Sequence, residues 1–250
     1  MSSRMLRTIG QKVSRIGDVI QEPRLLPLRL RGVEVRTFEC LNKPWLLKSG
    51  IRTVFDVGAN IGQFARAIHE VLPEAYIYSF EPLPDCFGEL QKAMAGVKTF
   101  RAFNMALAER DAEAEFYRSS WSPSSSLLPM QELHKQNFPF TAGESRQIVR
   151  VRRLDDYAEE LTIQGEVLIK LDVQGVEDKV IEGGKELIQR AKILIVETSM
   201  DSLYERQPLF ADIFKLLEAL GFTYKGALSQ AFSALDESVL YADSIFIRRI

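Results

Sequence analysis

The pattern of apolar positions changes at residue 51 and from there alternates between two periods. Short apolar runs rich in β-branched and aromatic residues predict strands, and apolar residues that recur every three or four positions predict amphipathic helices. The predicted strands cover residues 53–57, 76–80, 97–103, 113–118, 147–152, 166–171, 192–196, 222–225 and 244–248. The predicted helices cover residues 61–71, 85–95, 154–161, 176–189 and 209–220. Strands that alternate with helices predict a mostly parallel α/β sheet covered on both faces.

The first 50 residues show a different pattern, and we expect them to form an extension packed on a main domain of residues 51–250. Residues 1–31 carry seven Lys or Arg against two acidic residues, a local charge of +5. Their apolar positions share one helix face, which is typical of an interfacial helix on anionic lipid or of a helix packed on the domain. The absence of Trp or Phe from this face favours packing over membrane contact. Residues 32–38 alternate like a short strand, and residues 41–49 predict a short helix ending at Gly50.

Composition narrows the class of protein. The chain has 250 residues, 46% of them hydrophobic, which is enough for one large core. Its net charge of −2 provides no basic field that would recruit nucleic acid. Cys40 and Cys86 stand far apart, which argues against a disulfide framework and fits a reducing, cytoplasmic compartment. We expect no transmembrane segment, because no apolar run approaches ~18 residues. We expect no secretory signal either, because the N-terminus has no continuous apolar stretch of the kind such signals contain.

A glycine-containing turn follows the first strand of the main domain. It runs Asp56-Val57-Gly58-Ala59-Asn60-Ile61-Gly62 and leads into the 61–71 helix. Such a turn lets a ligand approach the backbone, and the helix N-terminus offers free N–H groups. A dinucleotide fingerprint requires G-x-G-x-x-G, whereas here Asn60 stands where the second glycine would be. The spacing therefore argues against a pyrophosphate ligand.

Polar residues at the ends of the predicted strands are the candidates for chemistry, because ligands of parallel sheets bind beyond the carboxyl ends of the strands. These residues are Asp56, Glu81, Asn104, Asp172 and Glu197. Glu81 follows Gly62 by 19 residues at the end of the second strand. An acid at about that spacing accepts hydrogen bonds from ribose hydroxyls in nucleotide-binding sheets.

Several segments carry a resemblance to a known family. The turn at residues 56–62 resembles the first motif of class I S-adenosylmethionine (SAM) methyltransferases and, in its D-V-G-A-N-x-G form, the FkbM family. Phe80-Glu81-Pro82 is similar to the same family, and residues 168–177 resemble its I-D-V-E-G-x-E motif, with Gln174 in place of the usual acid. The resemblance extends over about residues 45–250 and implies a Rossmann-like class I methyltransferase fold. That fold has a mostly parallel seven-stranded sheet, helices on both faces and an antiparallel C-terminal strand.

The resemblance implies SAM as cofactor and assigns roles to the turn. Asp56 would orient the loop or the amino group of SAM, Gly58 and Gly62 would keep the loop open, and Asn60 would offer an amide to the ligand. Asn104 begins a segment similar to the family's N-x-A-L and would lie near the adenine or the methionine part of SAM. An Asn that closes a turn is nearly as good an interpretation of Asn104.

The catalytic candidate is Asp172, at the end of a central strand and also within reach of the cofactor. Methyl transfer to a hydroxyl requires a held nucleophile and the removal of its proton, and a carboxylate does both. Glu197 is its neighbour on the next strand. His134 is the rival base, although a lone His in a loop is more often a polar surface residue. Asp172 and Glu197 together are also a possible Mg²⁺ site, which we do not favour because carboxylates on adjacent strands also occur without metal.

Residues 118–146 form an insertion rich in Ser, Pro and aromatic residues, which predicts either a substrate-side lid or a flexible linker. The favoured function is a SAM-dependent O-methyltransferase acting on a hydroxyl of a small molecule or glycan, of the sugar or polyketide type. Two alternatives stay open: a 2′-O-ribose RNA methyltransferase, and a SAM-binding scaffold without catalysis. The sequence does not indicate an oligomeric state.

Overall fold

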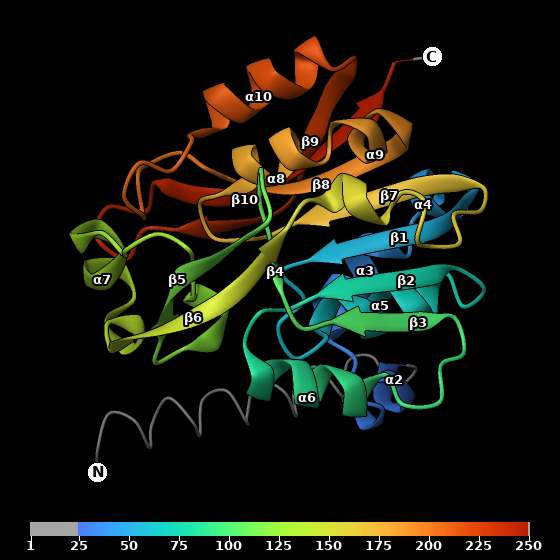
Figure 1. Cartoon of the computed structure of the whole chain (residues 1–250), viewed down its shortest axis with the longest axis horizontal. Coiled ribbons are helices and arrows are strands. Elements are labelled where there is room, and N and C mark those ends of the chain that lie inside the picture. The colour runs from blue at the N-terminus through green and yellow to red at the C-terminus, as the bar shows by residue number, and fades with distance from the viewer. Residues whose placement is uncertain (1–24, 250) are drawn as a thin grey trace.

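The computed structural model describes residues 25–249, and its centre is a seven-stranded sheet in the order β3-β2-β1-β7-β8-β10-β9 (Figure 1). Neighbouring strands from β3 to β8 pair in parallel, and β10 pairs antiparallel with β8 on one side and β9 on the other. The strands are β1 Ile51–Val57, β2 Tyr76–Phe80, β3 Phe100–Phe103, β7 Glu166–Leu171, β8 Ala191–Ser199, β9 Phe222–Phe232 and β10 Val239–Arg248. The predicted fold class is confirmed, including its one antiparallel C-terminal strand.

Helices cover both faces of this sheet, because successive strand residues point to opposite sides. On one face, Phe55 and Val57 of β1 join a cluster with α8 Glu177–Gly183, α9 Lys185–Arg190 and α10 Phe210–Ala219. On the other face, Val54 joins a cluster with helices that include α3 Val35–Leu41, α4 Pro44–Leu47, α5 Gln63–Val71 and α6 Pro84–Ala93. Figure 1 shows α3 and α5 behind the sheet and α8 in front of it.

A second, three-stranded sheet lies beyond the carboxyl ends of the parallel strands (Figure 1). Its order is β4-β6-β5, formed by β4 Ala106–Leu107, β6 Glu144–Arg152 and β5 Ala112–Ser119. Phe116 and Val149 pack against Leu83 and Cys86 at the start of α6. The predicted strands at 113–118 and 147–152 are thus present as β5 and β6. They belong to this second sheet rather than to the main one, and they border the carboxyl ends of the main-sheet strands.

The insertion is ordered into short helices over the same edge of the sheet. It contains η2 Ser122–Ser124, α7 Glu132–Asn137 and η3 Pro139–Thr141. Met130 is anchored in a small core with Leu203, Tyr204 and Leu240. The 3₁₀ helix η4 Leu154–Tyr157 replaces the longer helix expected at 154–161.

Two predictions about local structure need correction. The strand expected at 32–38 is wrong, because Val35, Phe38 and Leu41 lie one helical turn apart and pack with α5 as the helix α3. A run of seven residues is compatible with both the strand period and the helix period, so packing against α5 determines that it is a helix. The helix expected at 176–189 is broken at Gly184. A Cβ on the adjacent Gly183 would lie 2.0 Å from the Ala108 carbonyl oxygen, so the close approach of this backbone requires a glycine.

The N-terminal extension packs on the core where the structure describes it. Leu25 and Leu28, at the short helix α2 Leu26–Leu30, are buried in the cluster on the α5 face. Arg31 makes a two-pronged ion pair with Glu70 of α5. Residues 1–24, which include most of the predicted basic helix, lie outside the described residues. Within residues 25–249, no helix has the length and hydropathy to cross a membrane.

Candidate active site

The glycine turn is shaped by close contact between β1 and the end of β7. Gly58 and Gly62 have φ values of 82° and 88°, and Asn60 has a φ of 46°, a region where glycine is free and other residues are strained. A Cβ on Gly58 would stand 1.8 Å from the backbone oxygen of Asp172. The turn therefore needs glycine at position 58 for both its conformation and its space.

Glu81 organises this turn from the end of β2. Its carboxylate accepts the backbone N–H of Asn60 at 2.8 Å on Oε2 and that of Leu83 at 2.8 Å on Oε1. Only 4% of the residue is exposed, and burial raises the pKa of Glu81 to about 7. Each carboxylate oxygen keeps a second lone pair, so the group can still accept a hydroxyl donor.

Asn104 and Asn60 make contacts within the protein. The side-chain amide of Asn104 donates to the carbonyl oxygens of Glu81 at 2.9 Å and Pro82 at 3.0 Å. This geometry favours the turn-closing interpretation of Asn104. The Asn60 side chain donates to Ser122 Oγ at 3.1 Å and so joins the glycine turn to the insertion.

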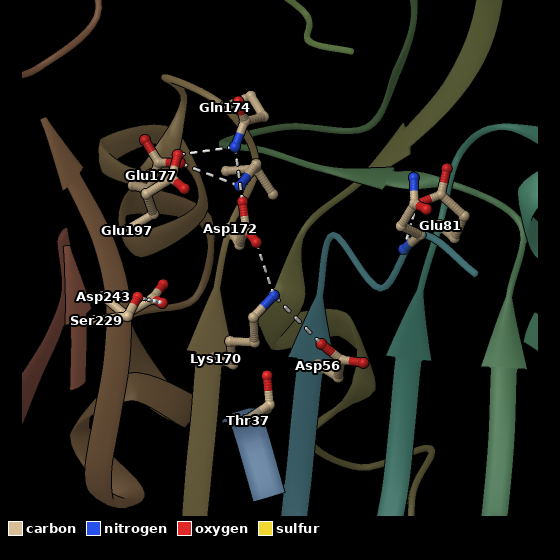
Figure 2. Close-up of polar contacts among 12 residues, drawn as sticks. Thr37, Asp56, Glu81, Lys170, Asp172, Gln174, Glu177, Glu197, Ser229 and Asp243 are labelled. Atoms are coloured by element: carbon tan, nitrogen blue, oxygen red, sulfur yellow. Dashed lines mark hydrogen bonds and ion pairs between the residues drawn. The ribbon is translucent and has the colours of Figure 1, made fainter. Parts of the chain in front are cut away.

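The charged centre of the site is a lysine between two aspartates (Figure 2). Lys170 Nζ lies 3.0 Å from Asp172 Oδ2 and 3.8 Å from Asp56 Oδ1. Burial alone would lower the pKa of Lys170, but Asp172 and Asp56 outweigh it and raise the pKa, so the lysine stays charged. Asp56 is fully buried, and its Oδ1 has no hydrogen-bond partner among the described residues. Burial, opposed by Lys170, raises the pKa of Asp56.

Gln174 bridges the two carboxylates that the sequence suggested as neighbours (Figure 2). Its side-chain N–H₂ donates to Asp172 Oδ1 at 2.8 Å and to Glu197 Oε1 at 2.7 Å. Its Oε1 accepts the hydroxyl of Tyr204 at 2.7 Å. Gln174 holds this position with a φ of 59°, which is uncommon for a residue other than glycine. An uncharged amide donor thus lies between the two acids.

The site holds more acidic side chains than basic ones. Burial and then the charges of Asp172 and Asp243 raise the pKa of Glu197 well above its usual value. Asp243 stands opposite Glu197 in the β8–β10 pairing, and burial followed by the charge of Asp172 raises its pKa too. Several acids therefore share one lysine, so burial and mutual repulsion favour the uncharged form of some of them, and a cationic ligand would favour their ionised forms.

His134, the rival base, is not the surface residue that a lone loop histidine suggests. It is 3% exposed, and burial lowers the pKa of His134 to about 4, so the ring is neutral at pH 7. Nδ1 lies 3.2 Å from Thr141 Oγ1, and Nε2 lies 3.4 Å from the Tyr204 hydroxyl. Tyr204 separates the imidazole from Gln174, so His134 contacts the carboxylates only through other side chains.

A cavity of about 460 Å³ joins these elements. Gly58, Asn60 and Glu81 line one part of it, and Lys170 and Asp172 line another. We call it the donor cavity. Met105, Ala106 and Leu107 line it, whereas Asn104 does not. Within the described part of the chain, no group of three or more His, Cys, Asp or Glu side chains has the arrangement of a metal site.

Sequence reasoning missed several residues of the site. Asp243 lies among apolar residues of β10, and a charge inside an apolar strand was a signal that could have drawn attention to it. Glu34 and Thr37 of the N-terminal extension also line the donor cavity, and no motif marks them. Tyr204 follows no recognisable pattern.

Comparisons with known proteins give a consistent result. A family model described as the methyltransferase FkbM domain matches residues 56–224. Over 179 residues, the chain is 30% identical to the 2-O-methyltransferase NoeI of Sinorhizobium fredii (strain NBRC 101917 / NGR234), covering 69% of this chain and 73% of that protein. It is 28% identical over 196 residues to the methyltransferase sdnD of Sordaria araneosa, covering 68% of this chain and 73% of that protein. The crystal structure of EvdMO1 is 13% identical with a TM-score of 0.48, covering 86% of this chain and 41% of that one.

Proposed function

The chain belongs to the FkbM methyltransferase family, and from this premise we propose that it transfers a methyl group from SAM to a hydroxyl of a small molecule or glycan. The transfer to oxygen rather than nitrogen or carbon is supported by the similarity to a protein named as a 2-O-methyltransferase. The observation that carries the proposal is the meeting of the glycine turn, Glu81 and Asp172 around one cavity.

The residues of the donor cavity fit SAM. The backbone of the turn at Gly58 and Asn60 lines the donor cavity, so a ligand there can contact it directly. Glu81 would accept the ribose hydroxyls, as acids at this strand end do in related sheets. Asp56 is fully buried, does not line the donor cavity and pairs with Lys170 at 3.8 Å, so its proposed role is to orient the turn rather than to bind the amino group of SAM. When bound, SAM supplies an electrophilic methyl group on a positively charged sulfur, and the excess of acids around Lys170 suits that charge.

Asp172 is the proposed base. Its carboxylate lies at the end of β7, beside the glycine turn of β1, and faces the donor cavity. Asp172 would accept the proton of the acceptor hydroxyl, whose oxygen would take the methyl group that SAM supplies, with S-adenosylhomocysteine as the leaving group. Lys170 and Gln174 fix the orientation of that carboxylate by hydrogen bonds at 3.0 Å and 2.8 Å. General-base assistance of this kind contributes about 10²–10⁴-fold in rate.

We propose that the reaction needs no divalent metal. The N–H₂ group of Gln174 donates to both Asp172 and Glu197, and a hydrogen-bond donor in that position disfavours a cation. Turnover should therefore survive a chelator. Loss of activity with chelator and recovery with Mg²⁺ would instead support the metal-bound alternative.

The defining experiment measures S-adenosylhomocysteine release in the presence of candidate acceptors, together with the affinity for SAM and for NAD. The proposal predicts SAM binding, far weaker NAD binding and acceptor-dependent release. Methylation of RNA riboses would favour the RNA alternative, and SAM binding without release for any acceptor would favour the scaffold. Both cysteines are free thiols, which supports our proposal of a reducing, cytoplasmic location. The assays therefore use reducing conditions.

A further inference from the structure

We propose that a second cavity, beside the donor cavity, is the acceptor site and that it binds a glycosyl unit against an aromatic wall. The inference rests on the proposed function and adds the substrate class. The cavity measures about 340 Å³, within the range of about 300–1,000 Å³ that small-molecule sites occupy. We call it the acceptor cavity.

The position of the acceptor cavity is the first argument. It lies between the insertion and the ends of β7, β8 and β10. Asp172, Gln174 and Asp243 line both this cavity and the donor cavity. A ligand hydroxyl that enters the acceptor cavity and reaches Asp172 therefore lies at the boundary with the donor cavity. This arrangement satisfies the need for the nucleophile, the base and the methyl donor to converge on one point.

The wall contributed by the insertion is aromatic. The rings of Trp121 and Phe140 lie 5.9 Å apart in an edge-to-face arrangement, and Phe138 lies 6.3 Å from Phe140. Trp121 and Phe140 nevertheless stay 53% and 55% exposed. Two large aromatic side chains that form a wall yet remain open to water mark a surface for a ligand. A flat ring face accommodates the apolar C–H face of a pyranose, whose hydroxyls then point sideways.

The opposite wall is polar and contains both acceptors and donors of hydrogen bonds. Glu197, Asp243, Ser229 and Tyr241 line the cavity. Ser229 donates its hydroxyl to Asp243 and keeps its oxygen as an acceptor, and the Tyr241 hydroxyl is the donor. Burial and then the nearby acids raise the pKa of Tyr241, so its hydroxyl keeps its proton. A ligand with several hydroxyls can satisfy these groups, whereas a largely apolar ring system would bury them without partners at a cost. The pairing of an aromatic wall with an acidic floor selects a carbohydrate over an apolar polyketide.

Ligand-observed NMR tests the proposal independently of turnover. The probes are methyl glycopyranosides of gluco, galacto, manno and 6-deoxy configuration, with S-adenosylhomocysteine present, and cyclohexanol serves as the apolar alcohol. We expect saturable binding of at least one glycoside and no comparable binding of cyclohexanol. Trp121→Ala should weaken glycoside binding about tenfold, the equivalent of about 1.4 kcal/mol, and Trp121→Phe should retain most of it.

The matched control is Phe232→Ala, which removes an aromatic residue 56% exposed and outside both cavities. It should leave glycoside binding unchanged. Saturable binding of no glycoside to folded protein, or binding that Trp121→Ala leaves intact, would overturn the acceptor-site inference. Methyl transfer to a non-carbohydrate alcohol, insensitive to Trp121→Ala, would sink the inference and keep the proposed function. Glycoside binding that depends on Trp121, in a protein that does not bind SAM, would support the acceptor-site inference and contradict the proposed function.

Discussion

Glu81 couples the affinity for SAM to pH, and its contacts allow the size of the effect to be worked out. The carboxyl is buried at the end of β2, with its pKa raised to about 7 by burial first and by Asp56 and Asp85 in addition. The ionised carboxylate accepts ribose hydroxyls much more strongly than the protonated carboxyl, which keeps only part of its acceptor capacity. With a pKa of about 7, roughly a tenth of the carboxyls are ionised at pH 6 and roughly nine tenths at pH 8. The affinity for the cofactor should therefore rise by up to about tenfold between these pH values.

The sign of the effect on stability is opposite. The folded-state pKa of Glu81 lies above the value of 4.5 for a free side chain. The stability that Glu81 contributes is therefore fully present below about pH 4.5 and lost as the pH rises through about 7. Because the ligand favours the ionised form, the increase in melting temperature caused by S-adenosylhomocysteine should grow from pH 6 to pH 8.

Calorimetric titration of S-adenosylhomocysteine across this range, with the wild type and Glu81→Gln, measures the effect. Gln cannot ionise, so the variant should bind more weakly by about 1–3 kcal/mol at pH 8 and should lose most of the pH dependence. Glu177 also has its pKa raised to about 7 by burial, but it accepts backbone N–H groups of Val173 and Gly175 and does not line the donor cavity. A pH dependence that persists unchanged in Glu81→Gln would refute the role given to Glu81.

Three further predictions follow from other parts of the structure. Gly58→Ala should lower the S-adenosylhomocysteine affinity more than about tenfold and lower the melting temperature, because its Cβ would clash with the backbone of Asp172. The control is Gly88→Ala, in α6 with open space around it, which should be neutral or stabilising by up to ~1 kcal/mol. Gln174→Met should shift the pH–rate profile to higher pH while leaving cofactor affinity within a few-fold, since Asp172 and Glu197 then face each other without the bridging donor; an unshifted profile contradicts the role of Gln174. Removal of residues 1–31 takes Leu25 and Leu28 out of the core and should lower the melting temperature. If the intact chain pelleted with anionic vesicles and the truncated chain did not, the segment would be shown to bind anionic lipid instead.

Most of the fold could be predicted from local sequence patterns. The strand, turn and helix from β1 to α5 follow from a buried apolar run, two glycines and an apolar face of helical period, and the structure contains all three. Parallel pairing then brings Asp56, Asp172 and Glu197 to one edge of the sheet, because each lies near the carboxyl end of one of three neighbouring strands. That inference needed only the rule that ligands bind at the carboxyl ends.

The remainder depends on contacts between residues far apart in the chain. The bridge from Gln174 to Tyr204 joins positions 30 residues apart, and no period in the sequence announces it. The placement of α3 against α5, and the separation of β4, β5 and β6 into their own sheet, were likewise decided by packing rather than by local preference. His134 was misjudged for the same reason, since burial comes from how the insertion folds over the sheet.

The proton acceptor is the central claim of this account, and Asp172→Asn tests it most directly. The substitution keeps the shape of the side chain and removes the charge beside Lys170. The single-turnover rate of methyl transfer, measured with enzyme shown to be folded and saturated with SAM, should fall about 10²–10⁴-fold, with SAM affinity within a few-fold of the wild type. A near-wild-type rate for Asp172→Asn, together with loss of transfer in His134→Ala, would contradict the account and place the base in the insertion.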